Sequence, residues 1–97
     1  MEGSDFKFIG LLASSDVTAL EKAQESYGDS WRNRGGVGAF MMLARKWDRI
    51  ENQVSNDNYD VFKTIKDDPS SDGILDDIRD LRRYLLLVEA HVSRKAS

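Results

Sequence analysis

The sequence predicts an all-α fold, and three observations support this. Apolar residues recur at intervals of three and four over two long segments, and strong helix formers fill a third segment. Alternating apolar runs joined by a tight Asn-Gly turn, which would indicate a β-hairpin, are absent from the sequence. With 97 residues, of which 40% are hydrophobic and 32% charged, the chain fits one domain with a modest core. We therefore expect a bundle of three or four helices within a single domain, residues 1–97.

The N-terminal part is expected to be an arm, residues 1–14, followed by a helical core at residues 15–95. Phe6–Leu12 is apolar but too short to indicate a helix or a strand, and we interpret it as a packing arm. Ser14–Asp16 supplies N-cap chemistry ahead of strong helix formers, so the first helix is predicted to begin there. Gly28 suits the position that follows a helix C-terminus.

The second helix is predicted to begin near Gly35 and Gly36 and to end at about Val54. At 100° per residue, the residues expected on its apolar face are Val37, Phe40, Leu43, Ala44, Trp47, Ile50 and Val54. Trp47 is expected in the core. Glu51 falls inside the same arc, where a carboxylate needs a base, a metal ion or N–H donors as a partner.

The opposite side of this helix is polar. Arg45, Arg49 and Asn52 are expected there, and Lys46 is expected near its rim. A short third helix is predicted over Asn58–Lys66, with Tyr59, Phe62 and Ile65 facing inward.

Pro69 ends this third helix, and Ser70 or Ser71 is expected to cap the last one. A heptad-like seam follows, made by Ile74, Ile78, Leu81, Leu85, Val88 and Val92. The seam and its apolar neighbours are extensive for a small domain, so we expect the bundle to be completed by homo-oligomerisation.

Trp31–Gly38 is a candidate anion site, because two arginines and three glycines precede a helix. The free N–H groups of Gly35 and Gly36 and the forked donors of Arg32 and Arg34 would suit a phosphate or a carboxylate. The alternative is that the glycines allow helices to cross closely and the arginines pair with acids. Two aromatic residues beside charged positions, Trp31 and Tyr84, are candidates for stacking on a base, although aromatic residues more often belong to the core.

Asp72, Asp76 and Asp80 recur every four residues and are expected to form one stripe of carboxylates on the last helix. Their mutual repulsion would be relieved by Mg²⁺, with Glu51 as a further ligand, or by basic side chains. The alternative is a solvated acidic face that Arg79, Arg82 and Arg83 neutralise in part.

Several function classes are disfavoured. The chain has no cysteine and a single histidine, His91, which argues against thiolate or histidine metal sites and Ser-His-Asp chemistry. A net charge of −3 argues against general nucleic-acid binding. No apolar run approaches the roughly 20 residues that span a bilayer, and no signal peptide is recognised. A cytoplasmic protein without membrane association is expected, or one in the host cytoplasm if it is viral.

The order of motifs resembles small MazG-like proteins, in particular the phage and bacterial branch associated with nucleotide modification. The resemblance covers residues 27–90. It depends on Tyr27-Gly28, on Lys46-x-x-Arg49-Ile50, and on the run Asp72-x-x-x-Asp76-x-x-x-Asp80-x-x-x-Tyr84.

This resemblance implies an oligomeric, all-α nucleotide pyrophosphohydrolase scaffold that uses Mg²⁺. It implies that Asp76 and Asp80 bind metal and that Asp72 replaces a family glutamate. It also implies that Lys46 and Arg49 meet phosphates and that Tyr84 shapes the pocket. The Glu-Glu-x-x-Glu motif of classical members is missing, which argues for ligand binding over turnover.

Three hypotheses remain open at the level of sequence. The first is a helical protein, of phage origin, that binds a phosphorylated nucleotide or a nucleotide-derived signal. The second is an Mg²⁺-dependent nucleoside triphosphate pyrophosphohydrolase. The third is a helical module without catalytic activity that binds another protein or itself.

Overall fold

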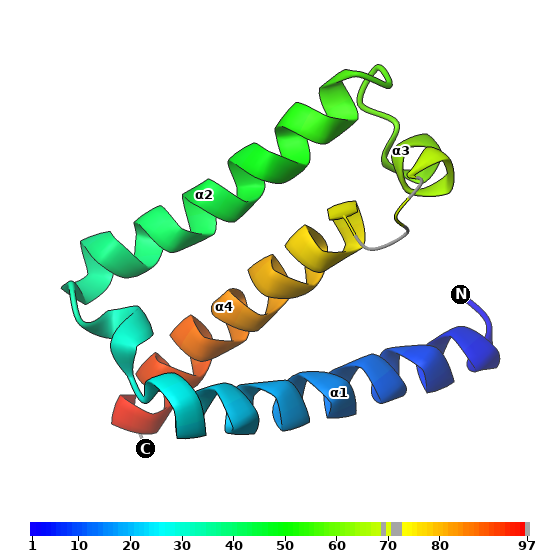
Figure 1. Cartoon of the computed structure of the whole chain (residues 1–97). Coiled ribbons are helices and arrows are strands. Elements are labelled where there is room, and N and C mark those ends of the chain that lie inside the picture. The colour runs from blue at the N-terminus through cyan, green and yellow to red at the C-terminus, as the bar shows by residue number, and fades with distance from the viewer. Residues whose placement is uncertain (69, 71–72, 97) are drawn as a thin grey trace. The chain divides into compact units, whose positions relative to one another are not determined.

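A computed structural model describes residues 1–68, 70 and 73–96. Its regular elements are helices, and no strand occurs in these ranges, which confirms the all-α class (Figure 1). The chain divides into two compact units, Met1–Ser30 and Trp31–Ser97. Whether they act as one domain stays a prediction.

The first unit is built on one long helix, α1 (Gly3–Tyr27). The expectation of an arm at residues 1–14 is wrong, because α1 begins at Gly3. The start is fixed by Asp5, whose carboxylate accepts from the backbone N–H of Glu2 over 2.9 Å. Ser14 lies inside the helix, where its carbonyl accepts from the Thr18 hydroxyl. The predicted end is confirmed: Gly28 has a φ of +56° and donates its N–H to the Gln24 carbonyl.

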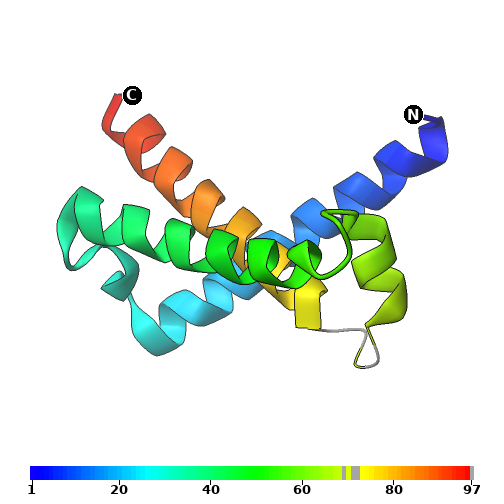
Figure 2. The ribbon, with the colours of Figure 1, turned by 90° about the horizontal axis from the view of Figure 1, so that it is seen from above.

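The second unit is organised by two long helices, α2 (Gly35–Ser55) and α4 (Gly73–Ala96). They run in opposite directions and cross, as the view from above makes clear (Figure 2). Their contact buries Ile50 and Val54 of α2 together with Ile74 of α4. Partly buried apolar side chains surround this cluster: Val61, Ile65, Ile78 and Leu81. A short 3₁₀ helix, η1 (Ser30–Arg32), precedes α2.

The apolar face predicted for α2 is only partly buried. Trp47 is 54% exposed, which contradicts its expected place in the core, and Val37 and Phe40 are more exposed still. The reason is geometric: α2 and α4 diverge toward the start of α2 and the end of α4, so contact is concentrated near Ile50 (Figures 1 and 2).

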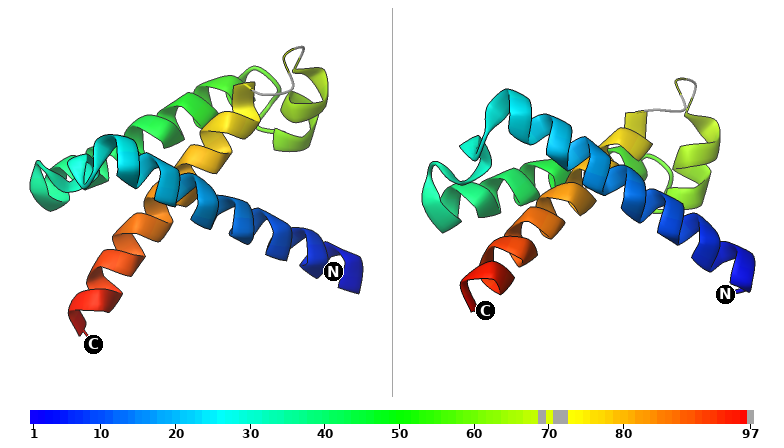
Figure 3. Two further views of the ribbon diagram at one scale, coloured as in Figure 1. Left: turned by 60° about the horizontal axis from the view of Figure 1, so that its bottom comes forward. Right: turned by 90° about the horizontal axis from the view of Figure 1, so that it is seen from below.

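A short helix, α3 (Val61–Asp67), lies beside the end of α2 and the start of α4 (Figure 3). It begins three residues later than predicted, because Asp60 caps it by accepting from the N–H groups of Phe62 and Lys63. Asn58 and Tyr59 instead form a turn with positive φ. Ile65 packs inward as predicted, whereas Phe62 and Tyr59 are exposed, contrary to prediction. Tyr59 lies in the turn before the helix, and Phe62 lies on a side of α3 that the core does not cover.

The start of α4 is held by side chains that precede it. Ser70 accepts from the N–H of Gly73, and Asp68 accepts from the N–H of Ile74. This agrees with the predicted capping role of Ser70, whereas Ser71 and Asp72 lie outside the described residues. The seam of α4 is best covered in its first half, where Ile74 is buried and Ile78 and Leu81 are partly buried. In the second half, Leu85 and Val92 are about half exposed.

Candidate functional site

The start of α2 has the geometry of an open helix N-terminus. Arg34 is the N-cap residue and makes no capping hydrogen bond with its side chain. Gly35 has a φ of +70°, a conformation that favours glycine. At Gly38, an added Cβ atom would lie 2.5 Å from Cβ of Arg34, so Gly38 leaves the space that the Arg34 side chain occupies. Glycine is therefore required here to keep an arginine against the first turn of the helix.

Arg45 and Arg49 extend this basic surface along α2. At 100° per residue, Arg34, Arg45 and Arg49 fall within about 60° of one another around the helix, and we call this surface the α2 basic face. Arg34 and Arg45 are exposed and have no ion-pair partner in the described part of the chain. Arg45 and Asn52 are exposed, as predicted for the polar side of this helix, whereas Arg49 also pairs with Asp77 of α4. The charges of Arg34 and Arg45 are available to a ligand.

A hollow lies on the α2 basic face beside Arg45 and Arg49. This shallow, open hollow of about 590 Å³ is lined by Met41, Ala44, Arg45, Asp48, Arg49 and Asn52. Met41 and Ala44 give it an apolar floor, whereas Asp48 and Asn52 offer hydrogen-bonding groups at its edge. A ligand with one flat apolar part and one anionic part would suit this combination.

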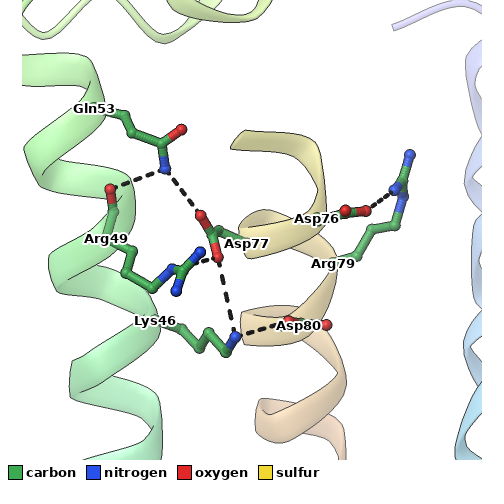
Figure 4. Close-up of polar contacts among 7 residues, drawn as sticks. All are labelled: Lys46, Arg49, Gln53, Asp76, Asp77, Arg79 and Asp80. Atoms are coloured by element: carbon green, nitrogen blue, oxygen red, sulfur yellow. Dashed lines mark hydrogen bonds and ion pairs between the residues drawn. The ribbon is translucent and has the colours of Figure 1, made fainter. Parts of the chain in front are cut away.

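A polar cluster joins α2 to α4 and contains Lys46, Arg49, Gln53, Asp77 and Asp80 (Figure 4). Asp77 accepts from Arg49 Nε and from Gln53 Nε2, each over 2.9 Å. Lys46 Nζ lies 2.8 Å from Asp80 Oδ2 and 4.0 Å from Asp77 Oδ1. These contacts fix Lys46 and Arg49 by pairing them with α4.

Burial distinguishes the two acids of this cluster. The Asp77 side chain is 3% exposed and that of Asp80 is 42% exposed. A buried carboxylate is tolerated only when charge and hydrogen bonds compensate it, and Asp77 has both. Asp80 gives Lys46 a second, more solvated contact. The cluster is thus built around Asp77, a residue that the sequence analysis did not place in a site.

The predicted metal ligands are held by separate partners. Asp76 pairs with Arg79 on its own helix at 2.6 Å and points away from Lys46 and Asp77 (Figure 4). Glu51 is exposed, where an apolar setting was expected, and accepts from Trp47 Nε1 over 2.9 Å. Asp72 lies outside the described residues. Among the residues that are described, no three His, Asp or Glu side chains form a metal-binding group. The metal site, which includes Asp72, stays a prediction.

The two candidates for base stacking are half-buried. Trp31 makes an edge-to-face contact with His91, with ring centroids 5.8 Å apart. Its neighbour Arg32 lies in η1, and Tyr84 lies on α4. The Trp31 ring is therefore engaged with α4, and the described contacts do not join Trp31 or Tyr84 to the α2 basic face.

Several residues of these surfaces were not predicted as site residues, and the main ones are Arg45, Gln53 and Asp77. Arg45 had a usable signal, since it shares a helix face with Arg49 and lies one turn away. Asp77 also had one, because it lies next to the apolar seam of the last helix. Gln53 had none, because its role depends on how α2 crosses α4.

A second polar group surrounds α3 and shifts the pKa of three side chains. The Thr64 hydroxyl and the Lys63 ammonium lower the pKa of Asp57, and Asp57 with Asp67 raises the pKa of Lys63. The hydroxyl and N–H of Ser70, with the N–H of Ile74, lower the pKa of Asp68 below its ordinary value. These contacts hold α3 and the start of α4 in place when the carboxylates are ionised.

Stability is therefore expected to fall in acid. Because the pKa of Asp68 and that of Asp57 are lower in the folded than in the unfolded chain, their contribution is complete above pH 3.8 and is lost as pH falls further. Replacing Asp68 by Asn should lower the thermal unfolding midpoint at pH 7, and the difference from wild type should shrink well below pH 3.8. Asp48→Asn, at an exposed carboxylate, should leave the midpoint at pH 7 unchanged. A difference that is independent of pH would contradict this account.

Comparison with protein-family models, curated proteins and solved structures gave no match. The resemblance to MazG-like proteins therefore stays a prediction. Among the described helices, none is both long and apolar enough to cross a bilayer.

Proposed function

We propose that this protein binds a phosphorylated nucleotide along the α2 basic face. The observation that carries the proposal is the packing of Arg34 across Gly38 at an open helix start, in line with Arg45 and Arg49. Free backbone N–H groups and the positive end of the helix dipole favour phosphate at such a position, and arginine adds forked donors. The class of ligand comes from the resemblance to MazG-like nucleotide hydrolases.

The length of the face suits an extended ligand. Arg34 and Arg45 are eleven residues apart, which corresponds to about 16 Å along a helix. In the proposed arrangement the phosphates lie toward Arg34 and the N–H groups of Gly35 and Gly36. The base or sugar occupies the hollow over Met41 and Ala44, where Arg45 can stack on a flat ring. Asp48 and Asn52 then offer partners to hydroxyl or amino groups of the ligand.

The test is a thermal-shift and calorimetric titration with the mono-, di- and triphosphates of the common nucleosides. Inorganic phosphate, titrated separately, is the comparison ligand. A ligand that binds only the folded state raises the unfolding midpoint. Arg34→Ala, Arg45→Ala and Gly38→Ala should each weaken binding at least tenfold. Lys66→Ala, which removes an exposed charge on α3, is the matched control and should bind normally.

Arg34 and Arg45 are informative because neither makes an ion pair in the described part of the chain. Their replacement should therefore change affinity without changing the unfolding midpoint of the free protein. If no nucleotide binds, or if the variants at Arg34 and Arg45 bind as well as Lys66→Ala does, the proposal is wrong.

Hydrolysis with Mg²⁺ is the alternative that the resemblance favours. Asp76 and Asp80 are its implied ligands, and both pair with cationic side chains, Arg79 and Lys46. Mg²⁺ would have to displace these partners. Release of pyrophosphate in the same titrations, with Mg²⁺ added, would favour the enzyme over the binding protein.

The proposal includes a homo-oligomeric assembly. It is supported by the second half of α4, where the predicted apolar seam lacks cover from α2. Three apolar side chains there are 42–56% exposed: Leu85, Leu86 and Val92. Apolar side chains repeated along a helix in this way favour packing against another helix.

A further inference from the structure

A second, smaller hollow continues the α2 basic face toward the end of the helix. Its volume is about 240 Å³. It is lined by Asp48, Glu51, Asn52, Ser55 and Tyr59. Asp48 and Asn52 also line the larger hollow beside Arg45 and Arg49, so the two hollows meet at Asp48 and Asn52. Both are formed within the unit Trp31–Ser97.

The two hollows differ in charge. The larger one has two arginines beside its apolar floor, whereas the described lining of the smaller one contains two carboxylates and no cation. An ionised carboxylate only accepts hydrogen bonds. The Ser55 hydroxyl donates to the backbone carbonyl of Asn52, so this hydroxyl also offers lone pairs to a ligand. A ligand that reaches from one hollow to the other therefore needs an anionic part at one end and hydrogen-bond donors at the other.

Asp48 lies at the centre of this surface. At 100° per residue it falls within about 60° of both Arg34 and Arg45 around α2. Asp48 is exposed and, within the described ranges, neither it nor Arg45 makes an ion pair, although they are three residues apart. A carboxylate at this position repels a ligand that offers only phosphate. It is compatible with an anionic ligand when that ligand also brings donors to Asp48.

Among the common nucleobases, guanine has the edge that best fits a carboxylate. Its N1–H and its 2-amino group are neighbouring donors, and they can donate in parallel to the two oxygens of one carboxylate. Adenine and cytosine each place an acceptor nitrogen beside their amino group, and uracil has one N–H between two carbonyl oxygens. These acceptors would face a negatively charged oxygen. A carboxylate in a base-binding hollow therefore favours guanine over the other three bases.

We infer that the protein prefers guanine nucleotides and that Asp48 is the residue that selects the base. The inference rests on the proposed binding of a nucleotide along the α2 basic face and names the base that is bound. The guanine ring lies over Met41 and Ala44 with its donor edge toward Asp48. The Arg34 side chain packs along Gly38, ten residues before Asp48, which corresponds to about 15 Å along a helix. An extended ligand can thus place its phosphates near Arg34 and its base beside Asp48.

The first test compares GTP, ITP and ATP as ligands of the unmodified protein by calorimetric titration. ITP lacks the 2-amino group of GTP, and ATP offers an acceptor where GTP offers N1–H. GTP should bind at least about fivefold more tightly than ATP, with ITP between them. Equal affinity for GTP and ATP, with binding that still requires Arg34 and Arg45, would keep the proposed nucleotide site and overturn the guanine preference. If none of the three binds, both proposals are wrong.

The second test replaces Asp48 by Asn. An amide offers a donor as well as an acceptor, and asparagine pairs well with adenine, so Asp48→Asn should bind ATP at least as tightly as GTP. Glu89→Gln, which removes an exposed carboxylate from α4, is the matched control and should keep the preference for GTP. If Asp48 acts by charge alone, Asp48→Asn will strengthen binding of all three nucleotides by one common factor. That result, or an unchanged preference for GTP, would overturn the role of Asp48.

Discussion

Replacing Ile74 by Ala is expected to lower the free energy of unfolding by about 2–5 kcal/mol. Ile74 has no exposed surface and packs against Ile50 and Val54 at the crossing of α2 and α4. Its removal leaves a cavity and takes away one of the three buried apolar side chains in the described core. For a chain of this size the thermal midpoint should fall by roughly 10 °C or more. Chemical and thermal unfolding, followed by circular dichroism at one fixed protein concentration, measure the change.

Two variants separate burial from side-chain size. Ile74→Val removes one methyl group and should lower stability by about 0.5–1.5 kcal/mol. Phe62→Ala removes a larger side chain, but Phe62 is 82% exposed and the change should stay within about 0.5 kcal/mol of wild type. Equal losses at Ile74 and Phe62 would show that the core is not at the crossing of α2 and α4.

The sequence predicted the helices well where local signals and burial agree. The end of α1 and the start of α2 are marked by Gly28 and Gly35, whose positive φ values suit glycine. The start of α1 was missed, because Ser14–Asp16 offered a conventional cap and residues 6–12 lacked a clear period. The Glu2 and Asp5 contact that opens the helix is an equally valid start signal, and it comes earlier in the chain.

Periodicity identified the faces of α2 and α4 but not how far each face is buried. Ile50 and Ile74 lie on the predicted faces and are buried, whereas Trp47 and Leu85 lie on the same faces and remain about half exposed. Burial depends on where two helices cross and where they diverge. The crossing is set by packing between side chains far apart in sequence, which a period of 3.6 residues does not encode.

The candidate site was predictable to a similar extent. A helix start with arginines and glycines can be recognised locally, and Arg34, Gly35 and Gly38 have the geometry that such a site needs. The partner of each charge was not predictable. The spacing of Asp72, Asp76 and Asp80 indicated one stripe, but it is Asp77 that turns toward Arg49, because the crossing places that side of α4 against α2.

Loss of the cations around Asp77 is expected to destabilise the fold more than loss of Asp77 itself. The double variant Lys46→Met with Arg49→Met leaves a buried carboxylate with Gln53 as its remaining partner in the cluster. We expect it to lower the free energy of unfolding by about 3–5 kcal/mol. Asp77→Ala removes the buried charge, and Arg49, which is 56% exposed, regains water. Its loss should be smaller, at about 1–3 kcal/mol. Urea unfolding at fixed protein concentration gives both values.

A triple variant provides the decisive comparison. Adding Asp77→Leu to Lys46→Met and Arg49→Met replaces the ionic cluster with apolar side chains of similar size. Such replacements are often neutral or stabilising, so the triple variant should recover most of the stability that the double variant loses. Recovery would show that the penalty of the double variant comes from the uncompensated carboxylate of Asp77. If the triple variant is no more stable than the double variant, Lys46 and Arg49 stabilise the crossing by packing rather than by charge.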